Sequence, residues 1–195
     1  MFGCLLQADK ILSAGGRVES FESKVISSVV DNFKNTLPKK DSPIINLRNE
    51  LYRVVEKASA QKTPGLFSLT APTGSGKTIN VLNAVLKIRD QIQKNNKVQS
   101  RIIYCLPFTS IIEQNYEVFE KVLKNSGYKI TSDILLKHHH LTDLQYETDD
   151  PEFDPDNSSL FVETWQSEII VTTFYQLLYT IFTNRNKNLK YASPH

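Results

Sequence analysis

The segment 66–78 reads LFSLTAPTGSGKT, an apolar run that leads into a glycine-rich turn and a Lys-Thr pair. The next residues, TINVLNAVLKIRDQIQ, carry apolar side chains at three- and four-residue spacing, which predicts an amphipathic helix. A strand, a tight turn and a helix in this order gather several peptide N–H groups at the helix N-terminus. This segment constrains the fold most, because it requires a strand and a helix joined by a loop that can wrap around an anion.

The residue types in this loop suit the binding of a nucleoside triphosphate. Gly74 and Gly76 let the backbone approach where a β-carbon would collide, Lys77 adds a charge for the β- and γ-phosphates, and the Thr78 hydroxyl suits Mg²⁺. The strict motif begins with Gly, whereas this chain has Ala71. We predict ATP and Mg²⁺ as ligands of Thr73, Gly74, Ser75, Gly76, Lys77 and Thr78. The alternative, a glycine turn that happens to precede a helix, leaves the Lys-Thr pair unexplained.

Short apolar runs alternate with helical patterns from residue 66 onward. Strands are expected at 66–71, 101–106, 134–136 and 168–172, with helices between them and a short apolar helix, FYQLLYTIF, after the last strand. The helix after 101–106 is expected to stop at Gly127. This alternation predicts an α/β fold with a parallel sheet. Two amphipathic helices are expected ahead of it, at 19–35 and 44–58.

Composition narrows the class of protein further. The 195 residues have 23 Lys and Arg against 21 Asp and Glu, so any contact with nucleic acid must be local. Cys4 and Cys105 form no CxxC pair, which indicates a reducing compartment and no structural zinc. Since no apolar run approaches the roughly 18 residues of a membrane span, a cytoplasmic protein without membrane contact is expected.

Three segments together resemble a known family. They are APTGSGKT at 71–78, YCLPFTSIIEQN at 104–115 and IIVTTFYQLL at 169–178. They are similar to superfamily 2 helicases and, more narrowly, to the CRISPR-associated helicase-nucleases of type I systems. The upstream segments CLLQADKILSAG and INLRNELY are also similar to that family. The resemblance covers nearly the whole chain, and 104–115 is its most specific part.

The resemblance implies a domain organisation. Residues 1–16 would be the end of a histidine-aspartate nuclease domain, 17–62 a helical connector, and 63–195 the first RecA-like motor domain, truncated before its Asp-Glu motif. Helicases hold Mg²⁺ and position the attacking water with an Asp-Glu pair at a strand end, and no apolar run of this sequence ends in such a pair. We therefore assign no catalytic residue, and we expect no ATP hydrolysis from this chain alone.

The resemblance also implies contacts to single-stranded DNA. Polar residues after a strand lie at the carboxyl edge of a parallel sheet, where ligands bind, and hydroxyl and N–H groups there can hold a DNA phosphate. The DNA-binding residues implied are Pro107, Phe108, Thr109, Ser110, Thr172 and Thr173. Without the resemblance, Ser or Thr after a strand is more often a helix cap.

One dense histidine cluster, His138 to His140, lies in the sequence. Consecutive side chains of a strand point to opposite faces, and no nearby Cys completes a ligand set, so we predict no metal site. Phe161 and Trp165 precede the last strand, and burial is expected for both, with stacking on a base as the alternative.

The function implied is the ATP-binding part of an ATP-dependent DNA helicase or translocase with nuclease activity. The whole protein would bind single-stranded DNA and degrade target DNA in CRISPR antiviral defence, with an RNA-guided surveillance complex as partner. One alternative is a non-catalytic nucleotide-binding module. Another is a different phosphate-loop ATPase or kinase, in which the segment LPFTSIIEQ has no assigned role.

Overall fold

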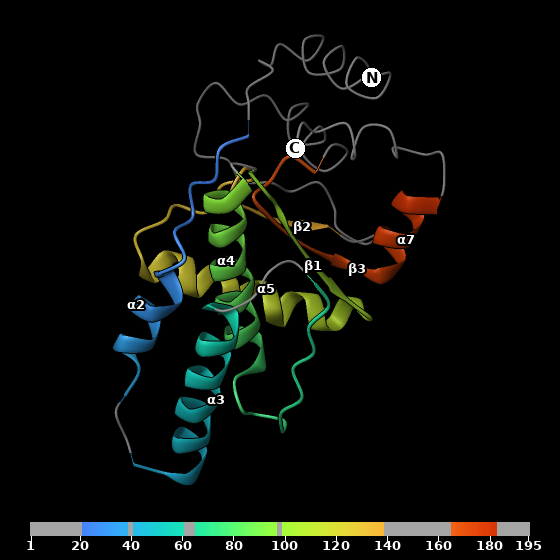
Figure 1. The fold of residues 1–195 in the computed structure, drawn as a ribbon. Coiled ribbons are helices and arrows are strands. Elements are labelled where there is room, and N and C mark those ends of the chain that lie inside the picture. Colours follow the sequence, from blue (N-terminus) through green and yellow to red (C-terminus); the bar gives the residue numbers. More distant parts are fainter. Residues whose placement is uncertain (1–20, 39–40, 61–64, 97–98, 139–164, 183–195) are drawn as a thin grey trace. The chain divides into compact units, whose positions relative to one another are not determined.

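The computed structural model describes residues 21–38, 41–60, 65–96, 99–138 and 165–182 (Figure 1). The chain divides into two compact units. Among the described residues, the first unit contains 21–24, 101–116, 130–138 and 165–182, and we call it the sheet unit. The second contains the described parts of 25–100 together with 117–129, and we call it the helical unit.

The sheet unit contains three parallel strands. They are β1 Ile102–Leu106, β2 Leu135–His138 and β3 Ile169–Thr173, in the order β1-β3-β2 (Figure 1). All five residues of β3 are buried, as expected for the central strand of a parallel sheet. Helix α7, Phe174–Phe182, follows β3 directly and contacts both β3 and β1. Its Leu177 packs on a small core formed by Leu136, Trp165 and Ile170.

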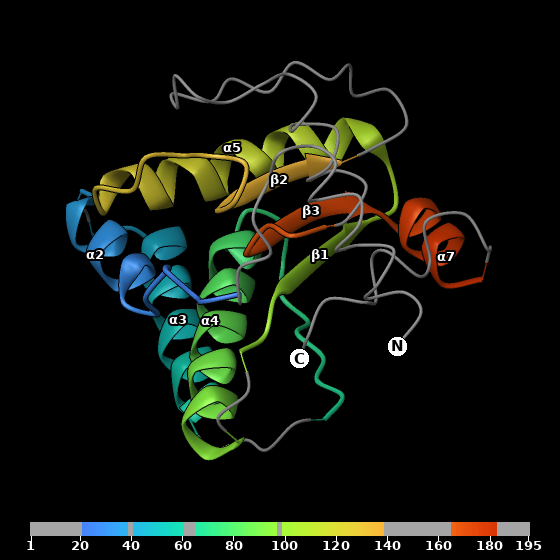
Figure 2. The ribbon, with the colours of Figure 1, turned by 90° about the horizontal axis from the view of Figure 1, so that it is seen from above.

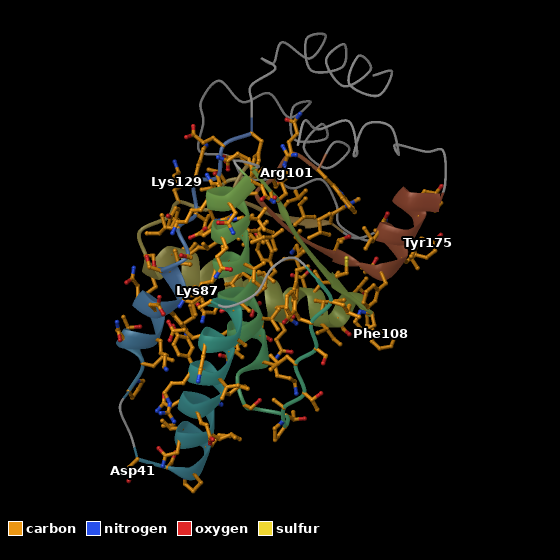
Figure 3. All side chains as sticks on the ribbon, in the orientation of Figure 1. Asp41, Lys87, Arg101, Phe108, Lys129 and Tyr175 are labelled. Atoms are coloured by element: carbon orange, nitrogen blue, oxygen red, sulfur yellow. The ribbon has the colours of Figure 1, made fainter. Side chains whose placement is uncertain are left out.

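The helical unit is built from α2 Val29–Thr36, α3 Pro43–Ala60 and α4 Lys77–Asn96 (Figure 2). Both α2 and α3 pack on α4. A polar network ties the three helices together: Lys87 of α4 lies 2.6 Å from Glu56 of α3 and 3.5 Å from Asp31 of α2 (Figure 3). The Tyr52 hydroxyl of α3 donates to the same Asp31 carboxylate. The position of α4 is therefore fixed by charged as well as apolar contacts.

Helix α5, Thr109–Asn125, begins after β1 and ends where the sequence predicts. Gly127 has φ +83°, and the Gly127 and Tyr128 N–H groups donate to the carbonyls of Lys124 and Leu123. These bonds satisfy carbonyls that the helix end leaves open, with glycine in the left-handed conformation that other residues avoid. The expected stop at Gly127 is confirmed.

The strand predicted at 66–71 is wrong, because these residues form no strand in the structure. Three strands make up the sheet of the described chain, and 66–71 is not among them. Leu66 is fully exposed and Phe67 is exposed. An apolar run becomes a strand only where a neighbouring strand accepts and donates its backbone hydrogen bonds. Among the described residues, no strand does this for 66–71.

The helix predicted from residue 19 is also partly wrong, since 21–26 have no helical structure and α2 begins at Val29. Ser23 donates through its hydroxyl to Glu168 at 2.7 Å, and the Lys24 N–H donates to the same carboxylate at 2.9 Å. Arg101 lies over the Phe21 ring at 4.3 Å from its centroid. These contacts within the sheet unit hold the segment out of the helix that its apolar pattern favours.

The α/β class with a parallel sheet and two preceding helices is confirmed. The strands predicted at 101–106, 134–136 and 168–172 appear as β1, β2 and β3 with ends shifted by one or two residues. In the part of the chain that the structure describes, no helix has the length and apolar character to cross a membrane.

Asp133, in the turn before β2, generates a prediction on acid stability. Burial acts to raise the pKa of Asp133, but hydrogen bonds from Lys24 and Thr131 outweigh it, so the pKa lies below its ordinary value. A carboxylate with a lowered pKa stabilises the folded state above its unfolded pKa, and this is lost as the pH falls through the folded value. Asp133→Asn should therefore destabilise the protein at pH 7 and have less effect near pH 3.

Urea unfolding at the two pH values checks this. The Lys24 side chain is 63% exposed, so water screens the pair and we expect a loss of less than about 1 kcal/mol at pH 7. Glu117→Gln, on an exposed position of α5, is the matched control. An equal loss for Asp133→Asn at both pH values would contradict the prediction.

Candidate nucleotide-binding site

The glycine-rich loop of the helical unit has the turn and the following helix that the sequence motif predicts, although the strand predicted ahead of it does not form. Gly74 and Gly76 adopt φ +79° and +84°, a region that favours glycine. Helix α4 begins at Lys77, so the first peptide N–H groups of the helix lie directly after the loop. The loop therefore turns twice through left-handed residues and ends on a helix N-terminus, which carries a partial positive charge.

The donors of the loop converge on two carbonyls. The Lys77 ammonium donates to the carbonyls of Ala71 at 2.7 Å and Pro72 at 3.1 Å. Ser75 is fully buried, and both its hydroxyl at 2.7 Å and its N–H at 3.3 Å donate to Pro72. The ammonium thus folds back over the loop from the first turn of α4. The loop is closed by its own hydrogen bonds, with Ser75 serving as its structural centre.

Two further side chains hold the outer carbonyls of the loop, and sequence reasoning did not find them as site residues. Arg48 of α3 donates through Nε to the Gly74 carbonyl at 2.9 Å. Asn80 of α4 donates through Nδ2 to the Gly76 carbonyl at 3.0 Å, beside its own backbone N–H at 3.1 Å. Arg48 lies in the segment INLRNELY, but its spacing carries no sign of a contact 26 residues away. Asn80 had a weak signal, since it follows Gly76 by one helical turn.

The structure brings the six predicted phosphate-site residues, Thr73 to Thr78, together in this one loop and helix start. Thr73 and Gly74 are exposed, while Gly76, Lys77 and Thr78 are half-buried. A hard cation such as Mg²⁺ prefers oxygen ligands, and the Thr78 hydroxyl is an oxygen donor beside the loop. The residue types and the cradle fit a polyphosphate with its cation.

The predicted DNA-binding residues lie in the sheet unit at the carboxyl ends of two neighbouring strands. Leu106, the last residue of β1, is paired with Thr173, the last residue of β3. Pro107 to Ser110 and Thr172 to Thr173 therefore share one edge of the sheet. Phe108 is 65% exposed at the end of β1, and Tyr175 is 67% exposed in the first turn of α7 (Figure 3). Ser110 is exposed, and Thr109 is half-buried.

The two threonines of this set have structural partners. Thr172 is fully buried and donates through its hydroxyl to the His138 carbonyl at 2.7 Å, which joins β3 to β2. The Thr173 hydroxyl accepts from the Gln176 N–H at 3.1 Å and caps α7. The helix-cap alternative thus applies to Thr173. A role of either residue in DNA binding stays a prediction.

His138 and Trp165 form one contact at the end of β2. The Trp165 indole N–H donates to His138 Nδ1 at 2.9 Å, and the two rings meet edge to face. Trp165 is buried, as expected, and has φ +51°, a costly conformation for a large residue that its hydrogen bond and packing hold in place. Within the described residues, no group of three side chains suits a metal ion. His139, His140 and Phe161 lie outside the described residues.

A parallel sheet flanked by helices and a glycine-rich loop ahead of a helix are typical of the class of phosphate-loop nucleotide-binding proteins. Residues 53–193 match the family model of the DEAD/DEAH box helicases, and the chain belongs to this family. The resemblance to superfamily 2 helicases is thereby confirmed, and with it an α/β fold of the RecA-like helicase type.

The chain is also similar to one named protein. The chain is 31% identical over 133 residues to the CRISPR-associated nuclease/helicase Cas3 of Haloferax volcanii. The alignment covers 65% of this chain and 14% of that protein. The chain therefore spans a small part of the length of the relative it matches.

The left-handed glycines of the loop generate a prediction. A β-carbon at Gly76 would lie 3.7 Å from Asn80 Nδ2 and 3.9 Å from Arg48 Cγ, which are ordinary contacts. Gly76→Ala should therefore act through backbone strain, of about 1–2 kcal/mol. Relief of that strain would open the loop, so we expect weaker binding of a fluorescent ATP analogue as well as a lower melting temperature.

Gly127→Ala is the matched control, because Gly127 has φ +83° and open space around its β position, but lies at the end of α5. It should lower the melting temperature by a similar amount and leave the affinity for the analogue unchanged. Equal affinities for wild type and Gly76→Ala would sink the prediction.

Proposed function

We propose that this chain is the ATP-binding part of an ATP-dependent DNA helicase or translocase with a linked nuclease, acting in CRISPR antiviral defence. The loop with left-handed Gly74 and Gly76 and with Lys77 at the start of α4 carries this proposal. Membership in a helicase family implies ATP use, and the similarity to a CRISPR-associated nuclease/helicase supports the defence role. Residues 1–16, 17–62 and 63–195 are assigned to the end of a nuclease domain, a helical connector and the first motor domain.

The loop binds the triphosphate by exchange of hydrogen bonds. In the structure, Lys77 and Ser75 donate to the carbonyls of Ala71 and Pro72. A phosphate oxygen is a stronger acceptor than a carbonyl because it is charged. Lys77 therefore turns from these carbonyls toward the β- and γ-phosphates, and the N–H groups at the start of α4 complete the cradle. Mg²⁺, held through the Thr78 hydroxyl, would neutralise charge on the phosphate oxygens.

The carboxyl edge of the sheet unit is proposed as the contact with single-stranded DNA. Ser110 and Thr109 with the first N–H groups of α5 suit a phosphate, and this contact reads no base. Phe108 offers an exposed ring on which a base can stack, and Tyr175, in the first turn of α7 after the neighbouring strand, offers another. The buried Thr172 ties β3 to β2 at this edge, and Thr173 caps α7 where that helix follows β3.

A non-catalytic nucleotide-binding module remains the second candidate. The loop with its left-handed glycines supports it as well, because a phosphate loop binds a nucleotide but does not by itself name a reaction. Both candidates share ATP binding and differ in turnover. Since we expect no hydrolysis from this chain alone, the assay that separates them measures phosphate release by the whole protein with single-stranded DNA present, where only the helicase shows turnover that the DNA stimulates.

Lys77 provides the direct test of ATP binding. Lys77→Ala removes the only charged group of the 71–78 loop, and we expect the affinity for a fluorescent ATP analogue to fall by about a hundredfold. Lys94→Ala, an exposed position near the other end of the same helix, is the control and should bind as wild type does. Unchanged affinity in Lys77→Ala would remove the phosphate-loop assignment.

Phe108 provides the test of DNA binding. Base stacking on an aromatic ring contributes about 1–3 kcal/mol, so Phe108→Ala should weaken binding of a labelled oligonucleotide by about tenfold. Val54→Ala removes an exposed apolar side chain from α3 and should have no effect. Fluorescence anisotropy at two salt concentrations gives both affinities. If Phe108→Ala and wild type bind the oligonucleotide equally, the proposed edge does not contact bases.

A further inference from the structure

A side chain of α3, a helix that precedes the phosphate loop in the sequence, binds the outer side of the loop. Arg48 lies in the first half of α3, and its Nε donates to the Gly74 carbonyl at 2.9 Å. Its Cγ lies 3.9 Å from the position that a β-carbon on Gly76 would take. The side chain thus passes close to both left-handed glycines of the loop.

This hydrogen bond fixes the direction of a peptide group that the loop needs. In a trans peptide the C=O and the following N–H point in opposite directions. Arg48 holds the Gly74 carbonyl, so the Ser75 N–H must point to the other side, and there it donates to Pro72 at 3.3 Å. That bond is long and weak, so a phosphate oxygen can replace Pro72 as the acceptor. Asn80 acts in the same way on the peptide between Gly76 and Lys77, because its side chain donates to the Gly76 carbonyl.

Glycine makes this restraint necessary. The residues that let the loop adopt positive φ also give it the widest range of other conformations. Each conformation in which the Ser75 N–H points away binds phosphate less well, so the affinity falls with the fraction of competent loops. A contact from a packed helix raises the fraction of competent loops before the nucleotide binds. Helix α3 can provide such a contact, since it is held on α4 by the network around Tyr52 and Lys87.

We propose that Arg48 is a positioning residue of the nucleotide site, which holds the phosphate loop in the conformation that receives the triphosphate. It acts through the Gly74 peptide and adds a permanent positive charge beside a site for a polyanion. The Arg48 side chain is exposed, so solvent screens that charge and the hydrogen bond carries most of the effect. The inference rests on the proposed ATP binding.

The test compares nucleotides on one set of variants of the whole chain. Arg48→Met removes the donor and the charge but keeps most of the stem, and we expect about tenfold weaker binding of a fluorescent ATP analogue. Arg48→Lys, which keeps the charge and one donor, should recover part of the affinity. Binding of adenosine, which has no phosphate, should be the same in all variants. Arg53→Met, an exposed position on the same helix, is the matched control.

The outcomes separate the two proposals. If wild type binds the analogue, Lys77→Ala does not, and Arg48→Met binds as wild type, the Arg48 inference alone is overturned. If wild type and Lys77→Ala bind alike, the phosphate-loop function fails and this inference fails with it. A melting temperature of Arg48→Met more than about 5 °C below wild type indicates a lost packing contact. Arg48→Lys then decides, because recovery of stability without recovery of ATP affinity contradicts the proposal.

Discussion

The orientation of a few peptide N–H groups between Pro72 and Thr78 is the constraint on which the site depends. Two left-handed glycines turn the chain, and α4 begins at Lys77, so the first N–H groups of the helix follow the loop directly. No side chain can substitute for this arrangement, because the donors belong to the backbone. The lysine adds charge, but its ammonium is useful only if the backbone has already formed the cradle around the phosphates.

The sequence predicts elements well where the pattern is local and less well where a distant partner decides. Neighbouring residues alone predict the helices α3, α4 and α5 and the stop at Gly127, and the structure confirms them. The segment 66–71 has an equally apolar pattern and forms no strand, since a strand exists only through the backbone of another. Residues 21–26, before α2, form no helix for a related reason, because Glu168, far along the chain, binds Ser23 and Lys24.

The same distinction holds for the candidate site. The phosphate loop is a contiguous motif, so its residues and their chemistry could be predicted from the sequence. The burial of Thr172 and its hydrogen bond to the His138 carbonyl could not be predicted from the sequence, because both depend on the order of the strands in the sheet. Thr173 was ambiguous between a phosphate contact and a helix cap, and its bond to Gln176 shows the cap. The contact of Arg48 could not be predicted, because an exposed arginine on an amphipathic helix has no pattern that distinguishes it from its neighbours.

One face of α3 connects these observations. Arg48, Tyr52 and Glu56 follow one another at four-residue spacing, which places them on the same side of the helix. They reach, in turn, the Gly74 carbonyl of the loop, Asp31 of α2 and Lys87 of α4. The loop is thus held at its outer carbonyl by the same helix face that holds α4, the helix on which the loop ends. The geometry of the phosphate loop therefore depends on how α3 packs on α4 within the helical unit.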